Sequence, residues 1–200
     1  MPRRSAIRLA VQGGVVALAV ALFGAGSAAQ TKGSPARFTA AAVNFDAPGR
    51  AAAGSVEMVV NRWSTDAERD RLMTALMEKG PEKLLDTLQD MPRVGYIRTP
   101  NSVGYDLHYA RRAPGEDGGE RITMATDRHI GFWEASAQPR SIEYPFTVIE
   151  IHMNKNGEGE GKLSLATKIT ADSDHKTIIL EDYGIQPVLL QHVREEKVSR

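Results

Sequence analysis

The chain contains no cysteine, so disulfide bonds, thiol catalysis and lipid attachment through cysteine are excluded. Its 25 basic residues equal its 25 acidic residues, and no basic tract occurs. Nucleic acid is therefore not an expected partner, and neither is an anionic membrane surface. The G-x-S-x-G motif of serine hydrolases is also missing. The sequence thus predicts no catalytic residue and no cofactor.

Residues 1–29 have the composition of a secretory signal peptide. Arginines come first, an apolar run follows at 15–23, and small residues occupy 27–29. The apolar run is too short to span a membrane. We expect cleavage after Ala29 and export to the periplasm or the medium, with no stable membrane span afterwards. A bacterial origin suits an exported chain that has no disulfides.

The rest of the chain is expected to form a flexible lead at residues 30–37 and a single β-rich domain at 38–200. Short alternating runs, separated by turn residues, recur after residue 93. The expected fold is α+β, with about eight or nine antiparallel strands in a barrel or sandwich and one helical hairpin after the second strand. Residues 187–194 fit strand or helix, and we prefer strand because strands precede them. No pattern indicates an oligomeric state.

Two helices are expected after the second strand, over residues 65–79 and 81–90. Thr65 is a good N-cap, and Glu68 three residues later completes a capping box. Leucine and methionine then recur at helical spacing until Gly80 ends the first helix. Each helix has a single apolar stripe, so the pair is expected to lie against the sheet or to cap one end of a barrel.

A small-molecule site is predicted from aromatic residues on or beside the strands. A turn at residues 99–102 forms a hairpin that pairs Tyr96 with Tyr105 and gives them a common face. Trp133 lies in a later link, and Arg98 shares a face with Tyr96, where its charge suits an anionic group. These four side chains are the candidate ligand-binding residues. A plain aromatic core is the alternative explanation for the rings.

The longest hairpin is expected to turn at Asn156-Gly157, because this dipeptide is the strongest short hairpin signal. A two-residue loop pairs Glu150 with Leu163 and places both on one face. A three-residue loop with a bulge at Gly157 pairs Ile151 with Leu163 and moves Glu150 to the opposite face. The sequence leaves both registers open, and with them the question of whether Glu150 points into the core.

An acid occurs two residues before a histidine three times, as Asp106 and His108, Asp127 and His129, and Glu150 and His152. On a strand this spacing puts both side chains on one face. Histidine and carboxylate ligands from neighbouring strands can form a metal site. Such residues are also common on the solvated faces of antiparallel strands. We therefore name Asp106, His108, Glu150 and His152 as candidate metal ligands without predicting a bound metal.

Three hypotheses of function follow from these patterns. The first is an exported, non-enzymatic module that binds a small apolar or aromatic ligand between sheet and helices. The second is a metal-dependent hydrolase that uses the acid–histidine pairs. The third is a structural envelope protein that acts through the surface of its sheet.

Three stretches of the chain resemble an uncharacterised family of exported bacterial proteins: RWSTDAERDRL at 62–72, PRVGYIRTPNSVGYDLHYARR at 92–112 and GEGEGKLSLATKI at 157–169. The likeness covers most of the chain after residue 29. It implies export from a bacterium and a shared fold. It implies no activity and no catalytic residue.

Overall fold

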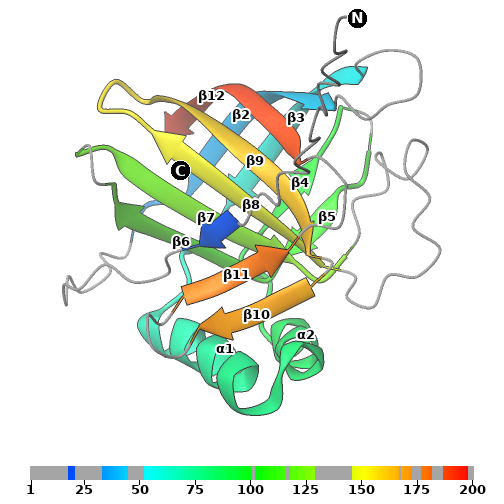
Figure 1. Cartoon of the computed structure of the whole chain (residues 1–200). Helices are drawn as coiled ribbons and strands as arrows, with labels where there is room; N and C mark the ends of the chain where they lie inside the picture. Colours follow the sequence, from blue (N-terminus) through cyan, green and yellow to red (C-terminus); the bar gives the residue numbers. More distant parts are fainter. Residues whose placement is uncertain are drawn as a thin grey trace, which may run out of the picture.

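A computed structural model describes residues 18–20, 33–44, 52–100, 102–115, 118–128, 146–166, 168–172, 177–181 and 187–197. A nine-stranded antiparallel sheet makes up the main part of the fold and curls into a nearly closed barrel (Figure 1). Its strands are β2 (Ala36–Asn44), β3 (Ala52–Val60), β4 (Gly95–Arg98), β5 (Tyr105–Leu107), β6 (Tyr109–Pro114), β7 (Glu120–Thr126), β8 (Phe146–Met153), β9 (Glu158–Ala166) and β12 (Val188–Lys197). The predicted α+β class with a mainly antiparallel sheet is confirmed, and so is the strand at the end of the chain.

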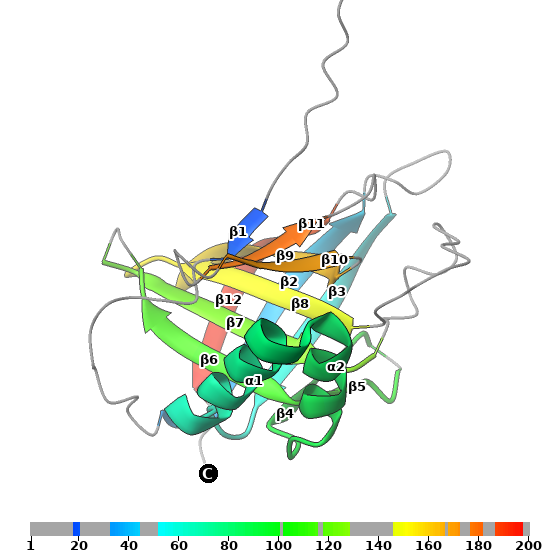
Figure 2. The same cartoon turned by 60° about the horizontal axis from the view of Figure 1, so that its bottom comes forward.

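Two smaller layers lie outside the barrel. The helices α1 (Asp66–Lys79) and α2 (Pro81–Gln89) cross the outer face of β6 and β7, as Figures 1 and 2 show. A three-stranded sheet of β1 (Leu18–Val20), β11 (Thr177–Glu181) and β10 (Lys168–Asp172) lies alongside β8 and β9. Strand β1 falls within the segment predicted to be a signal peptide. No helix in the described part of the chain is long and apolar enough to cross a membrane.

The helical hairpin begins and ends where its sequence signals predict. The side chain of Thr65 accepts a hydrogen bond from the backbone N–H of Glu68 at 3.2 Å. The Glu68 carboxylate accepts one in return from the backbone N–H of Thr65 at 2.7 Å, which completes the capping box. Gly80 has a φ of +81°, a left-handed value that glycine adopts without strain, and it separates the two helices. The predicted helical hairpin after the second barrel strand is confirmed.

The barrel runs in the order β5-β4-β3-β2-β12-β9-β8-β7-β6, and one bent segment of chain forms both ends of this order. Strand β5 pairs with β4, strand β6 pairs with β7, and only His108 separates β5 from β6. The backbone N–H of His108 donates to the carbonyl of Ala125 at 3.0 Å. Ser64, just beyond β3, exchanges two hydrogen bonds with the backbone of Ala110, at 2.7 and 3.0 Å. These bonds join the ends of the sheet and nearly close the barrel.

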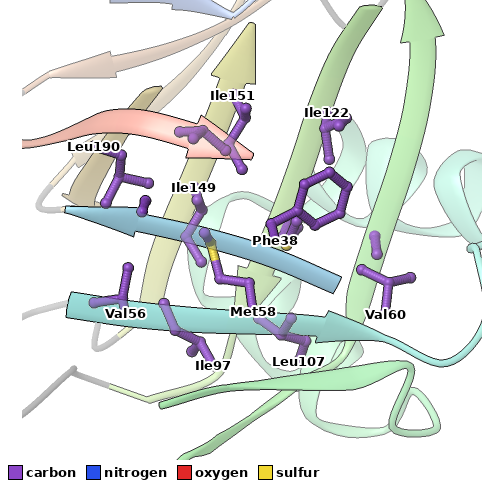
Figure 3. Packing of buried hydrophobic residues seen from close by; sticks show 14 of the residues in the cluster. Phe38, Val56, Met58, Val60, Ile97, Leu107, Ile122, Ile149, Ile151 and Leu190 are labelled. Carbon is purple, nitrogen blue, oxygen red and sulfur yellow. The ribbon is translucent and has the colours of Figure 1, made fainter. Parts of the chain in front are cut away.

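Apolar side chains pack the interior of the barrel. Figure 3 shows Phe38, Met58 and Ile122 reaching inward from different strands, and all three are fully buried. Alternation along each strand places such residues inside at every second position. Burying one side chain of this size stabilises the fold by about 1.5–3 kcal/mol. A second apolar cluster lies between helices and barrel and includes Leu76, Leu88, Tyr109 and Phe146. Both contact layers are therefore closely packed.

The register predicted for the first hairpin is wrong by one residue. Tyr96 pairs with Asp106 rather than with Tyr105, and Tyr105 pairs with Ile97. The cause is Gly104, which has a φ of +88° and adds one residue to the connection. A Cβ at this position would lie 2.9 Å from the carbonyl oxygen of Ile97, so the bend needs glycine.

The second hairpin has the three-residue loop, but neither predicted register is correct. Residues 155–157 form the loop, with Gly157 at a φ of +79°. The side chain of Asn154 accepts hydrogen bonds from the backbone N–H groups of residues 156 and 158, at 2.8 and 3.1 Å. Leu163 pairs with Ile149, two residues from the partner predicted for this loop. A register shift of two residues leaves each side chain on the same face of the sheet. Glu150 therefore points away from the barrel core, as the three-residue alternative requires.

Candidate functional site

In the fold, His108 lies beside a different acid from the one two residues before it. The Nε2 atom of His108 lies 3.4 Å from Oδ1 of Asp127, and its Nδ1 lies 2.8 Å from the carbonyl oxygen of Met91, to which it donates. Asp106, the expected partner, pairs instead with Arg93 at 3.0 Å. The side chains of His108 and Asp127 are each only 15% exposed. Their contacts connect the end of α2, the bend before β6 and the end of β7.

The contacts of His108 with Asp127 and Met91 do not form a metal site. Within the residues that the structure describes, no group of three or more histidine, aspartate or glutamate side chains is placed to hold a metal ion. Glu150 and His152 lie on β8 without a second acid–histidine pair beside them, and His129 lies outside the described residues. A catalytic metal needs at least three protein ligands in most sites, and the described residues supply two at His108.

Tyr96 and Arg98 lie together on the outer face of the barrel. The guanidinium carbon of Arg98 is 5.3 Å from the centre of the Tyr96 ring, and that of Arg93 is 5.6 Å away. Glu57 accepts hydrogen bonds from the Tyr96 hydroxyl at 3.2 Å and from Arg98 at 3.1 Å. The corrected register puts Tyr105 on the inner face, where it packs against the barrel core. Trp133 lies outside the described residues, and a role in ligand binding stays a prediction for all four candidates.

Arg112 contacts side chains from several parts of the chain. Its guanidinium carbon lies 4.7 Å from the centre of the Trp63 ring, and it pairs with Glu195 and, at 3.3 Å, with Glu120. The indole N–H of Trp63 donates to the carbonyl of Ser34 at 3.2 Å. These contacts join β6, β7, β12, the segment before β2 and the segment after β3. They hold five parts of the chain together.

Among the described residues, Glu150 is the only charged residue that is buried. It sits on the outer face of β8, because its neighbours Ile149 and Ile151 point into the barrel and are fully buried. It is nevertheless only 9% exposed. Among the residues that can be described, none gives its carboxyl group a hydrogen bond or an ion pair. Burial raises the pKa of Glu150, and the charges of Arg121, His152 and Lys162 oppose this rise only in part.

The register of the sheet defines the surroundings of this carboxyl group. Thr123 on β7 and Lys162 on β9 are the direct cross-strand partners of Glu150, and we call these three residues the Glu150 row. Cross-strand partners have Cβ atoms about 4.5–5.5 Å apart. The adjacent row contains Arg121 and His152. Thr123 is buried, whereas His152 and Lys162 are exposed. The Glu150 row therefore runs from the buried hydroxyl of Thr123 to the solvent-exposed ammonium group of Lys162.

Two outer layers lie near β7 and β8. In Figure 2 the helices lie on one side of β7 and β8, and the small sheet lies on the other. Helix α2 contacts β10, so the two outer layers meet. The sequence marks Glu150 as a candidate, but it gives no sign that the carboxyl group is buried, because the burial arises only in the folded chain.

Chemically, the Glu150 row offers a carboxyl group of raised pKa, a hydroxyl group and nearby cations. This set can bind a polar ligand by hydrogen bonds and charge. Comparisons of the chain with protein-family models, with curated proteins and with solved structures find no match. The resemblance to an exported bacterial family therefore stays a prediction, and the functional argument rests on the geometry given above.

Proposed function

We propose that the chain is an exported, non-enzymatic binding module whose ligand site lies on the outer face of the barrel at the Glu150 row. The barrel core and the layer between helices and barrel are both packed with apolar side chains of the protein itself. The described residues therefore favour a polar ligand on the outer face over an apolar ligand in either layer.

One observation carries this proposal: Glu150 is only 9% exposed and no described residue gives its carboxyl group a hydrogen bond, while its oxygens are not among the fully buried polar atoms, so a ligand can reach them. Burying an unpaired carboxyl group destabilises a fold, and an amide or apolar side chain would be tolerated better there. Proteins keep such local conflicts mainly at functional sites. A ligand that pairs with Glu150 would remove the conflict.

A binding role fits the site better than catalysis. General acid–base or nucleophilic catalysis needs a second reacting group within hydrogen-bond reach of the first. In the described portion of the fold, no histidine or hydroxyl group forms a hydrogen bond with the Glu150 carboxyl group. His108 is held between Met91 and Asp127 and is not joined to a nucleophile there. The described geometry thus supplies binding groups and lacks a catalytic dyad.

Native mass spectrometry of the protein purified from its own host tests the proposal. We expect the wild-type chain to retain a small molecule and the Glu150→Leu variant to lose it. Val103→Ala is the matched control, because it shortens an exposed side chain in the connection before β5, outside the Glu150 row, and it should keep the ligand. If wild type carries no small molecule, or if Glu150→Leu carries the same one, the proposed function is wrong.

A further inference from the structure

We infer that the edge of strand β11 binds an extended apolar peptide after a host peptidase has hydrolysed the bond following Ala29 and so removed residues 1–29. The inference goes beyond the small-ligand site and takes from the proposed function only the export of the chain. The peptide adds to the small sheet as a further strand, through backbone hydrogen bonds. The binding edge is the backbone of residues 177–181.

Strand β1 occupies this edge in the uncleaved chain. The small sheet runs in the order β1-β11-β10, so β11 is its central strand (Figure 2). Residues 18–20 pair antiparallel with residues 178–180, and Ala19 lies opposite Ile179 at the centre. By sequence, every one of these pairs combines two uncharged aliphatic residues. The structure thus shows which kind of segment the edge accepts, namely one that is short, extended, uncharged and apolar.

Loss of residues 1–29 removes β1 and leaves this edge of β11 open. In the described part of the chain, no other strand pairs with it. An open edge presents a row of unpaired backbone N–H and C=O groups, which can pair with another chain. The sequence of β11, TIILE, contains neither the proline nor the lysine that commonly prevent such pairing. The edge is therefore suited to accept a strand.

The other sheet edges in the described residues are less suited to a partner strand. The ends of the barrel sheet meet through the bonds of His108 and Ser64. Strand β6 ends in Pro114, which has no N–H to donate. Strand β10 begins and ends with a charged residue, whereas the three residues of β11 that pair with β1 are all aliphatic. These differences select β11 as the peptide-binding edge.

Cleavage controls access to the edge. Because β1 belongs to the same chain, its effective concentration at β11 is high, and a free peptide competes with it poorly. The uncleaved chain is therefore closed to a partner. Removal of residues 1–29 abolishes this competition, so that only the exported protein binds the peptide.

A peptide of residues 15–23, with two lysines added at each end for solubility, is the probe. We expect it to bind the cleaved protein purified from its host and to slow amide hydrogen exchange at residues 177–181. The full chain that retains residues 1–29 should bind it at least about tenfold more weakly. The full chain carrying Leu18→Pro and Ala19→Pro should bind it as the cleaved protein does, because proline cannot donate a hydrogen bond to β11.

Backbone N-methylation of the probe tests strand pairing without changing the protein. The N–H groups of a strand point alternately to its two sides, so only one alternating set faces β11. One peptide is methylated at the positions of residues 17, 19 and 21, and the other at those of residues 16, 18 and 20. We expect one of them to bind about tenfold or more weakly than the unmodified probe and the other to bind as before, since only one loses the backbone bonds.

The inference is overturned if the cleaved protein does not bind the probe, if the two methylated peptides bind equally, or if the slowed exchange lies outside residues 177–181. It is also overturned if the two prolines leave the full chain closed, if the exported protein keeps residues 1–29, or if it dimerises through residues 177–181 and excludes the probe. In each case a Glu150-dependent small molecule in native mass spectra leaves the proposed binding function standing.

Discussion

His108, between β5 and β6, lies beside Asp127, which directly follows β7, with 3.4 Å between Nε2 and Oδ1. Neither residue pairs with the acid or histidine two positions away from it in any described contact. The other ring nitrogen of His108 reaches the carbonyl of Met91, just after α2. The imidazole of His108 thus connects the helical hairpin with the start of β6 and the end of β7.

Removing the contacts of His108 with Met91 and Asp127 should destabilise the end of α2. We expect His108→Ala and Asp127→Asn each to lower the free energy of unfolding by about 1–3 kcal/mol, because each leaves buried polar atoms without partners. A double-mutant cycle in urea should give a coupling energy of about 1 kcal/mol. Amide hydrogen exchange at residues 88–91 should accelerate in both variants. Full additivity of the two substitutions would show that the pair contributes nothing as a pair.

Replacing the buried carboxyl group should stabilise the protein without ligand. The folded-state pKa of Glu150 is raised above 4.5, so above that pH the folded chain holds this proton more strongly than the unfolded chain. Its contribution to stability therefore falls as the pH rises from 4.5 through the folded-state pKa. Glu150→Gln removes this loss and should add about 1 kcal/mol at neutral pH, and nothing below about pH 4. Urea titrations at several pH values provide the measurement. A variant less stable than wild type at neutral pH would contradict the prediction.

The capping box should show the opposite pH dependence. A hydrogen bond from Arg62 lowers the pKa of Glu68, against a smaller opposing effect of burial. A carboxyl group with a lowered folded-state pKa stabilises the fold above its unfolded value of about 4.5, and this stabilisation is lost as the pH falls through the folded-state pKa. Glu68→Gln should therefore cost stability at pH 7 and little at pH 3. Thr65→Ala should cost about 1 kcal/mol at pH 7, because it removes the cap of the Glu68 N–H, and less at pH 3, because the Thr65 hydroxyl also donates to the Glu68 carboxylate at 3.3 Å.

Two glycines with positive φ form a matched pair for mutation. Gly157→Ala should cost about 1–2 kcal/mol, since the position is left-handed but no atom lies within 4 Å of the added Cβ. Gly104→Ala should cost more, because the added Cβ would also meet the carbonyl oxygen of Ile97 at 2.9 Å. Urea unfolding of both variants measures the difference. Equal costs would mean that the connection before β5 can relax.

Local sequence signals predict the parts of this fold that local interactions determine. The capping box at Thr65 and Glu68 and the glycine between the helices lie within a few residues of each other, so the helical hairpin was correctly placed. Hairpin registers depend on single bulged residues, and Gly104 shifts one register without a distinct signal in the sequence. The partnership of His108 with Asp127 and the burial of Glu150 depend on strands that come together only in the folded chain.

Strand β12 has a consequence for when the protein can fold. It lies between β2 and β9 and is paired with both, so it provides the strand pairing between the two halves of the barrel sheet, whose other edges meet through the bonds of His108 and Ser64. A nascent chain that has not yet emerged as far as Val188 leaves β2 and β9 with unsatisfied backbone groups. The decisive pairing spans nearly the whole polypeptide, and contacts so distant in sequence make folding slow. The barrel sheet is therefore complete only after its last strand has been synthesised.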